Sequence, residues 1–365
     1  MKKIGVFTFH RAHNYGALLQ AFALQQFLNI DYECYMVDYI NNSVYDNYKI
    51  MKPIGKNVFK YPFRIYNNLK YYKKNKSRFM KFNNFINENL NILKLENIDE
   101  CFALITGSDQ VWNYNITGGL KDEYTLNFPN NKSLKISYAA SIGDVNLIDK
   151  DVDNYKNKLK KIDFISVREM DLKEKISKLL NEDVELVLDP TLLLTAKEWD
   201  KYLYKNKNNE KYILAYVVEP DEEYIKIVNE ISKETGFKVI YFEKMNPGYN
   251  DVLLEAYVSD PFEFIEYIKN AEYIITTSFH ATVFSIIYQK KFWVIPHKKT
   301  GSRVNNLLSN LNIKNRSINN ILEFKNRIFD EDIDYKSVNK LLNERVKKSK
   351  NWILEKLNKT GDTNE

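Results

Sequence analysis

The feature that most restricts the fold of this chain is the alternation of strand-like and helix-like runs along its length. The alternation is clearest in residues 270–296. Residues 273–277 are rich in β-forming side chains, residues 281–288 follow with helical spacing, and residues 292–295 resume a strand. Ser278 is suited to cap the helix. The segment is therefore expected to form a βαβ unit, in which two parallel strands share one sheet.

His280 falls in the first turn of this predicted helix, just beyond the carboxyl end of the preceding strand. Ligands of open α/β sheets bind at that edge, and a helix start offers N–H groups and partial positive charge to an anion. A histidine there can both touch an anion and move a proton. The residue type alone fits a second interpretation equally well, in which His280 only packs against or caps the helix start.

Two domains are expected, because a single core usually stops growing at about 250 to 300 residues and this chain has 365. We expect an N-terminal Rossmann-like domain at 1–205 with a helical insertion at 41–97, a C-terminal Rossmann-like domain at 206–335, and a helix at 336–365 that crosses back to the first domain. The predicted class is α/β, with two doubly wound domains facing each other across a cleft. Other strands are expected at 4–9, 35–38, 103–106, 135–139, 164–167, 184–188, 212–218 and 238–242, and other helices at 16–28, 171–180, 222–235, 261–269, 303–311 and 337–357.

Composition indicates a soluble globular protein, with 44% hydrophobic and 28% charged residues. Cys34 and Cys101 form neither a zinc pattern nor a disulfide framework, so we expect a reducing compartment and no metal. The apolar run at 4–9 ends at His10 and is too short for a secretion signal. No apolar run reaches the roughly 18 residues of a membrane span. We therefore expect a cytoplasmic protein.

The net charge of +6 is concentrated in residues 56–82, which hold nine Lys and Arg and no acid, so the other residues carry a net charge of −3. Aromatic residues are interleaved with these cations. The pattern suits a segment that rests on the inner face of an anionic membrane or on a phosphate-bearing acceptor. The ordinary alternative is a helical hairpin with a solvated face and an aromatic face docked on the core. No nucleic-acid-binding motif accompanies the charges, so no nucleic acid partner is expected.

Polar residues also follow two strands of the first predicted domain. Residues 10–17 contain Asn14 and Tyr15 at a strand-to-helix turn but no GxGxxG, so a dinucleotide fingerprint is absent. Residues 107–113 place Ser108, Asp109 and Trp112 at a strand end. Polar side chains beside an aromatic plate suit sugar hydroxyls, and the alternative is a capped turn with Trp112 in the core.

Two arginines complete the set of candidate site residues. Arg168 follows the strand at 164–167 and could bind a carboxylate or phosphate with two hydrogen bonds, although pairing with Glu169 or another acid is the ordinary structural use of such an arginine. Arg303 stands at another expected helix start. Together with His280, these residues would form a site for a small, multiply charged anion.

Six stretches carry a resemblance to a known family. They are NYGALLQAFALQ from Asn14, GSDQVWN from Gly107, SYAASIG from Ser137, SVRE from Ser166, DPTLLL from Asp189 and TSFHATVFSIIYQKKFWVIP from Thr277. Their order and approximate spacing resemble those of the polysaccharide pyruvyltransferase family over most of residues 1–311. The resemblance implies a glycosyltransferase-B-like (GT-B-like) fold. It also implies a transferase that uses phosphoenolpyruvate as co-substrate, without a cofactor, to place a pyruvate ketal on a sugar of a cell-surface glycan or its lipid-linked precursor.

The resemblance also makes His280 and Arg168 functional residues by motif match and assigns the donor to the second domain. Many members read Arg-Leu-His where this chain reads Ser278-Phe279-His280. Either Arg303 replaces the missing cation, or this branch of the family uses another donor or acceptor. The expected site is then catalytic His280 and Asp109; donor-binding Arg168, Ser278, His280 and Arg303; and acceptor-binding Asn14, Tyr15, Ser108, Asp109 and Trp112.

Two other functions fit the same sequence. A two-domain α/β cleft could bind a nucleotide-sugar and serve an ordinary glycosyltransferase. The basic, aromatic segment 56–82 could instead belong to a non-catalytic scaffold at the membrane surface in glycan assembly.

Overall fold

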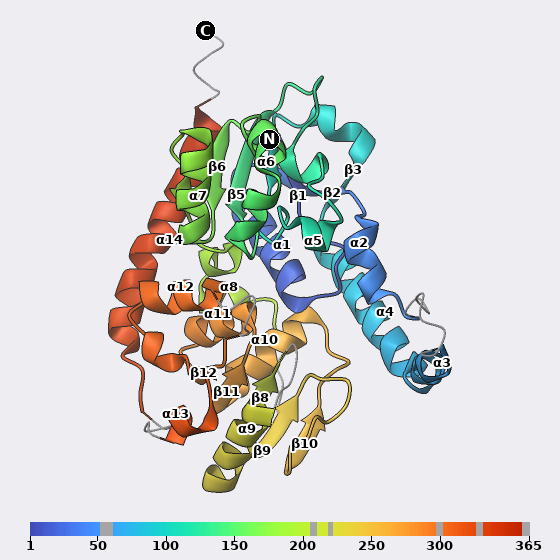
Figure 1. The fold of residues 1–365 in the computed structure, drawn as a ribbon, viewed down its shortest axis with the longest axis vertical. Coiled ribbons are helices and arrows are strands. Elements are labelled where there is room, and N and C mark those ends of the chain that lie inside the picture. Colours follow the sequence, from blue (N-terminus) through green and yellow to red (C-terminus); the bar gives the residue numbers. More distant parts are fainter. Residues whose placement is uncertain (52–60, 205–209, 218–221, 297–301, 326–330, 360–365) are drawn as a thin grey trace. The chain divides into compact units, whose positions relative to one another are not determined.

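The structure, a computed structural model, describes residues 1–51, 61–204, 210–217, 222–296, 302–325 and 331–359 (Figure 1). The side chains of residues 61–64 and 302 lie outside this description, as does most of the polar connection at 205–211. The chain divides into two compact units. Unit 1 comprises Met1–Tyr72, Phe82–Leu194 and Asn343–Glu365, and unit 2 comprises Lys73–Lys81 and Thr195–Leu342.

Unit 1 is built on a parallel sheet of seven strands in the order β3-β2-β1-β4-β5-β6-β7. The order reverses between β1 and β4, which pair directly. The strands are β1 (Lys3–Phe7), β2 (Glu33–Asp38), β3 (Ile92–Lys94), β4 (Ala103–Thr106), β5 (Leu134–Ala140), β6 (Phe164–Val167) and β7 (Glu185–Leu186). The helices are α1 (Tyr15–Leu28), α2 (Asn42–Tyr45), α3 (Tyr61–Lys70), α5 (Tyr114–Thr117), α6 (Val152–Leu159), α7 (Met170–Leu180) and part of α4 (Tyr72–Asn89).

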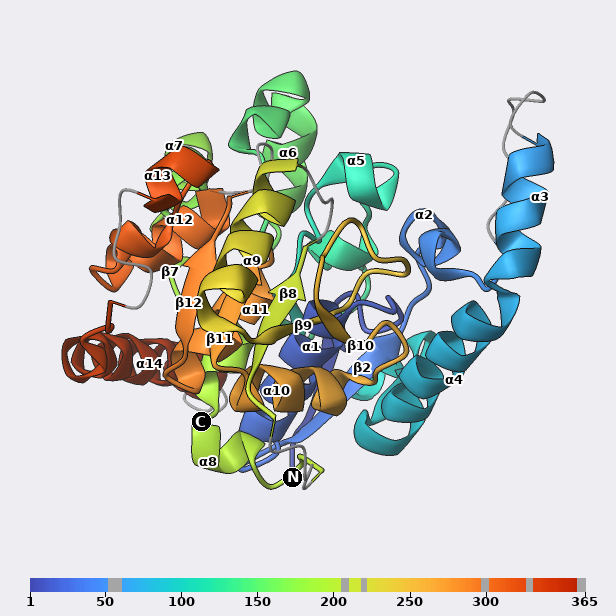
Figure 2. The same cartoon turned by 90° about the horizontal axis from the view of Figure 1, so that it is seen from below.

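Unit 2 is built on a parallel sheet of five strands in the order β10-β9-β8-β11-β12 (Figures 1 and 2). Here the order reverses between β8 and β11. The strands are β8 (Tyr212–Tyr216), β9 (Lys238–Tyr241), β10 (Val252–Glu255), β11 (Tyr273–Thr276) and β12 (Lys291–Val294). The helices are α8 (Ala196–Trp199), α9 (Glu222–Thr235), α10 (Pro261–Asn270), α11 (Phe279–Ile287), α12 (Ser302–Asn310), α13 (Ile321–Lys325) and the start of α14 (Tyr335–Asn358).

The central strands read as continuous apolar runs because helices cover both faces of a parallel sheet. All four residues of β4 and all four of β11 are buried. Helix α1 is apolar all round and buries every residue except Gln26, as a helix enclosed within a core does. Helix α9 is amphipathic and buries one side only. Both sheets are doubly wound, as the alternating sequence predicts.

Two strands were not predicted from the sequence. Strand β3 lies within the segment expected to be mainly helical, and β10 lies in a segment with no expected element. Each is a short edge strand, so it has a single neighbour in its sheet. Neither β3 nor β10 is buried along its whole length. Their sequences therefore show little of the apolar pattern from which strands are predicted.

Helix α14 completes unit 1, to which its residues from Asn343 onward belong. Ser349 Oγ accepts a hydrogen bond of 3.0 Å from the backbone N–H of Leu188, just beyond β7. The Trp352 ring lies 6.5 Å from the ring of Tyr138 on β5. In the described part of the chain, no helix combines the length and apolar character needed to cross a bilayer.

Candidate functional site

The loop from β11 into α11 lies at the carboxyl edge of the unit 2 sheet, where the strand order reverses. Thr276 of β11 pairs with Tyr216 of β8, and the next residue, Thr277, donates its N–H to the Tyr216 carbonyl. Ser278 is the N-cap of α11, and its Oγ accepts from the N–H of Ala281 at 3.4 Å. The first turn of α11 therefore stands at the position where doubly wound sheets bind ligands.

His280 and Arg303 contact the same aromatic ring at this edge. The His280 imidazole is 8% exposed and meets the Phe279 ring edge to face at 5.2 Å. The guanidinium carbon of Arg303, in the first turn of α12, lies 5.9 Å from the centroid of the Phe279 ring. Unit 2 thus brings together an imidazole, a guanidinium and a helix N-terminus, a set that suits an anion carrying phosphate and carboxylate groups.

Glu243 is a titratable residue at the same edge that was not identified from the sequence. It follows β9, and its Oε1 accepts from the N–H of Val217, just after β8, at 3.1 Å and from the Tyr249 hydroxyl at 3.4 Å. Burial raises the pKa of Glu243 to about 7. The only feature of the sequence that indicated Glu243 was an acidic residue next to the end of an apolar strand. This pattern is too common to identify a functional residue.

The carboxyl edge of the unit 1 sheet holds a buried network of paired charges. Arg168 donates from Nη1 to Asp189 Oδ2 at 2.6 Å and from Nε to Glu169 Oε1 at 3.2 Å. Ser108 Oγ donates to the same Asp189 oxygen at 3.0 Å, and Ser141 Oγ donates to Glu169 at 2.8 Å. Residues that follow β4, β5, β6 and β7 are thereby linked into one network.

Burial by itself would lower the pKa of Arg168, but the nearby carboxylates of Glu169, Asp189 and Asp109 outweigh it and the pKa is raised. The guanidinium is therefore charged, and acids of its own unit hold it. This is the structural pairing that the sequence left open as the alternative to ligand binding. The sequence analysis singled out Asp189 only as the first residue of the DPTLLL stretch and did not predict that it pairs with Arg168.

The acceptor candidates of unit 1 differ in exposure. Asn14 is exposed and caps α1, accepting from the N–H of Ala17 at 3.2 Å. Asp109 is half-buried and accepts from the N–H of Gln110 at 2.8 Å. Both residues can present oxygen atoms to solvent or to a ligand.

Three other acceptor candidates are buried. Tyr15 packs with its ring 5.1 Å from that of Phe82. Trp112 is fully buried and donates its indole N–H to the Tyr124 carbonyl at 2.9 Å, which is the core placement described as the alternative. Ser108 is buried in the network around Asp189.

The predicted residues thus form two sets. Unit 1 brings Ser108, Asp109 and Arg168 together at one sheet edge, and unit 2 brings Ser278, His280 and Arg303 together at another. Within the described ranges, no cluster of three or more His, Cys, Asp or Glu residues is placed to hold a metal ion.

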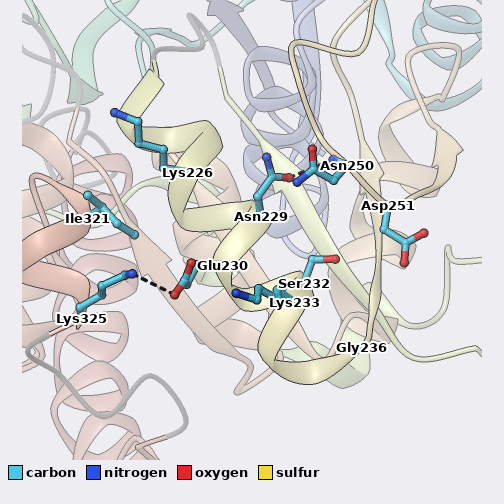
Figure 3. A pocket seen from close by; sticks show the side chains of 10 residues that line it. All are labelled: Lys226, Asn229, Glu230, Ser232, Lys233, Gly236, Asn250, Asp251, Ile321 and Lys325. Atoms are coloured by element: carbon cyan, nitrogen blue, oxygen red, sulfur yellow. Dashed lines mark hydrogen bonds and ion pairs between the residues drawn. The ribbon is translucent and has the colours of Figure 1, made fainter.

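A surface pocket of about 770 Å³ lies elsewhere in unit 2, between α9, α13 and the loop before β10 (Figure 3). Two pairs of its polar groups bind each other: Lys325 pairs with Glu230 at 3.0 Å, and Asn229 accepts from the N–H of Asn250 (Figure 3). The lining includes Gly236, which lies between the end of α9 and the start of β9 and hence at the amino edge of the sheet. Ligands of such sheets bind at the carboxyl edge. We therefore do not take this pocket, despite its volume, as the candidate active site.

Solved structures with similar folds define the class of protein. A UDP-GlcNAc 2-epimerase from Neisseria meningitidis, bound to UDP-GlcNAc, is 14% identical, with 98% of this chain and 100% of that chain covered and a TM-score of 0.53. Another UDP-N-acetylglucosamine 2-epimerase is 11% identical, with 100% and 97% covered and a TM-score of 0.55. These likenesses, together with the two parallel sheets, show a GT-B-like fold and confirm the predicted class.

The family is shown by sequence. The sequence model of the polysaccharide pyruvyl transferase family matches residues 14–299. This chain belongs to that family, as its six motifs predict, and the family is one of transferases. A comparison with curated proteins found no match.

Proposed function

We propose that the protein transfers the pyruvyl group of phosphoenolpyruvate to a sugar of a cell-surface polysaccharide or its lipid-linked precursor, forming a ketal and releasing phosphate. Family membership over residues 14–299 supports the reaction class. The structural observation that carries the proposal is the place of His280, in the first turn of α11 at the strand-order reversal of unit 2, with Arg303 on the same Phe279 ring.

The chemistry needs three kinds of group. Protonation of C3 of the enol develops positive charge at C2, a sugar hydroxyl attacks C2, phosphate leaves, and a second hydroxyl closes the ketal ring. A proton donor, an acceptor for the hydroxyl protons and cations for the carboxylate and phosphate are therefore required. In this proposal His280 moves the protons, and Arg303 with the capped N-terminus of α11 holds the anion.

Unit 1 would supply the acceptor side. Asp109 and Asn14 would orient the sugar, and Asp109 could accept a hydroxyl proton. Arg168 would act as a positioning residue, because its bonds to Asp189 and Glu169 order the loop that carries Ser108 and Asp109. We place the reaction in the cytoplasm at the inner face of the cell membrane, where a lipid-linked acceptor would be present.

The first test needs no acceptor. A ligand that binds only the folded protein raises its stability by about 2.7 kcal/mol at 100 times its Kd, so phosphoenolpyruvate should raise the melting temperature. A panel of nucleotide-sugars should not. A rise with a nucleotide-sugar and none with phosphoenolpyruvate would instead favour a glycosyltransferase. No stabilisation by any of these donors would favour a non-catalytic scaffold.

The second test addresses His280. Replacing His280 with Ala should lower phosphoenolpyruvate-dependent phosphate release by at least about 100-fold, the usual contribution of a general acid or base, and should leave the melting temperature of the free protein nearly unchanged. His280→Gln is the matched variant, because it keeps a hydrogen-bonding side chain that cannot titrate. Near-normal phosphate release from both variants would remove His280 from the mechanism.

A further inference from the structure

Helix α4 divides its basic residues between two faces. Lys74, Arg78 and Lys81 recur at intervals of four and three and so share one side of the helix. Lys74 pairs with Glu255 at 2.6 Å, and Lys81 pairs with Glu263. Arg78 donates to the Tyr257 carbonyl at 2.6 Å and lies over that tyrosine ring at 4.9 Å. All these residues belong to unit 2, so this face of α4 serves packing within that unit.

The other face of α4 carries Lys73, Lys76 and Met80, again spaced by three and four. All three are exposed, and the Met80 side chain is 53% exposed. Among the described residues, neither Lys73 nor Lys76 forms an ion pair. This face therefore presents two cations and a flexible apolar side chain to the surroundings.

Helix α3 precedes α4 in the chain, separated from it by Tyr71 alone, and has an exposed face of the same kind. Tyr66 and Leu69 are 58% and 66% exposed. Lys70 lies on the same side, with its ammonium 5.7 Å from the Tyr66 ring. Exposed apolar side chains that gather on one side of a helix are typical of a surface that binds a partner or a membrane.

The positive charge around these two faces indicates that an anionic partner would bind them. No acidic residue occurs between Asp46 and Glu88, so nothing in this stretch of sequence repels an anionic surface. Lysines suit lipid headgroups, and aliphatic side chains such as Leu69 and Met80 suit the acyl boundary beneath them. Single-stranded nucleic acid favours rows of aromatic platforms for base stacking, and of the exposed residues named on these two faces only Tyr66 is aromatic.

We propose that two exposed faces, one on α3 in unit 1 (Tyr66, Leu69, Lys70) and one on α4 in unit 2 (Lys73, Lys76, Met80), each dock on an anionic phospholipid membrane. This inference deepens the proposed function by bringing the enzyme to lipid-linked acceptors, but it does not depend on the identity of the donor. It also divides the basic segment, since Lys74, Arg78 and Lys81 take no part in docking.

The test uses the full chain and sedimentation with vesicles of phosphatidylcholine, alone or mixed equally with phosphatidylglycerol. The wild-type protein should bind the mixed vesicles at least tenfold more tightly, with binding weakened by salt. The triple variant K70E/K73E/K76E should lose at least tenfold. Leu69→Ser combined with Met80→Ser should lose several-fold at constant charge, which separates insertion of apolar side chains from simple attraction of charge.

The matched control is K336E/K340E/K347E, which reverses three exposed lysines of α14 and should change vesicle binding less than twofold. Equal binding to both kinds of vesicle, or equal losses in the two triple variants, would overturn the proposal. Loss of oligonucleotide binding in K70E/K73E/K76E, with vesicle binding unchanged, would assign the surface to nucleic acid and would also overturn it.

The outcome can be separated from that of the proposed function. K70E/K73E/K76E should keep the melting-temperature rise with phosphoenolpyruvate, and His280→Ala should keep vesicle binding. Far-UV circular dichroism of each variant establishes that the helices are retained. A variant that binds neither vesicles nor donor would point to misfolding, and the Leu69→Ser, Met80→Ser pair then decides the proposal.

Discussion

The carboxyl edges of the two sheets are built in opposite ways. At the unit 1 edge, Arg168 is enclosed by Glu169 and Asp189, and two serines donate to the same carboxylate oxygen atoms that accept from the guanidinium. At the unit 2 edge, His280 and Arg303 rest on Phe279 beside a helix start held by one serine cap. Acids of its own unit hold the cation at the first edge, whereas the cation at the second edge lies on an aromatic ring beside a helix start, where doubly wound sheets bind ligands.

From this difference we propose separate tasks for Arg168 and Arg303, the two arginines that the sequence analysis expected in one donor site. Changes at the unit 1 network should act mainly on stability, and changes at the unit 2 edge should act mainly on donor binding and turnover. Four predictions follow from this contrast, beginning with the one expected to have the largest effect.

Arg168→Ala should lower the free energy of unfolding by about 3 to 5 kcal/mol, because it leaves Glu169 and Asp189 buried without their cation. Urea denaturation measures the loss. The control is Arg11→Ala, since Arg11 pairs with Asp38 at 2.8 Å but is partly exposed, and such pairs are worth about 1 kcal/mol or less. A stable Arg168→Ala protein that no longer responds to phosphoenolpyruvate would return Arg168 to the donor site.

Arg303→Ala should raise the KM for phosphoenolpyruvate by about 10- to 100-fold, as expected for loss of a hydrogen bond to a charged ligand worth roughly 1.5 to 3 kcal/mol. The melting temperature of the free protein should hardly change. Lys325→Ala, at the pocket of α9 and α13, is the control and should leave the KM unaltered. If Arg303→Ala binds the donor normally, the cation that replaces the family arginine lies elsewhere.

The two N-caps give a matched pair of smaller effects. Asn14→Ala and Ser278→Ala should each cost about 1 kcal/mol of unfolding free energy, the typical value of a cap. Ser278→Ala should also weaken the stabilisation by phosphoenolpyruvate, whereas Asn14→Ala should not. If phosphoenolpyruvate raised the melting temperature of both variants by the same amount, the proposed functional difference between the two edges would be wrong, even if both variants lost stability.

The smallest expected effect is a pH-dependent change in stability at Asp38. This residue ends β2 at the carboxyl edge of the unit 1 sheet, where it lies beside His10 and Arg11. His10 and the Arg11 guanidinium lower the pKa of Asp38 to about 2. A lowered carboxyl pKa contributes stability above the unfolded value near 4, and that contribution is lost as the pH falls from about 4 to 2. Asp38→Asn should therefore be less stable than wild type by under about 1 kcal/mol at neutral pH. The difference should disappear near pH 2, and a constant difference across that range would show another cause.

The sequence predicted the architecture well because both sheets depend on strong local patterns. Central strands such as β4 and β6 were placed with their observed bounds, since buried parallel strands are short, continuous apolar runs. The edge strands β3 and β10 were missed, because an edge strand needs few apolar residues. Helices such as α9 and α11 were found through their spacing and caps, as at Ser278, whereas α6 and the short helices α5, α8 and α13 were missed.

Side-chain partners were harder to predict than elements. The sequence placed Arg168 correctly at a strand end but could not decide between ligand and acid, because Asp189 is distant in sequence and meets Arg168 only in the folded sheet. Trp112 shows the same limit, since a strand-end tryptophan can face a ligand or the core. Contacts within one helix start, such as that of Phe279 with His280, join residues that are neighbours in sequence and are therefore easier to predict.

Helix α14 has a consequence for the order of events during synthesis. Ser349 and Trp352 supply contacts to Leu188 and Tyr138 of unit 1, yet they are translated after all of unit 2. Domains generally begin to fold as they emerge from the ribosome, but unit 1 cannot be completed at that stage. Nascent chains halted before residue 343 should therefore remain protease-sensitive in unit 1, and a separately supplied α14 peptide should protect them.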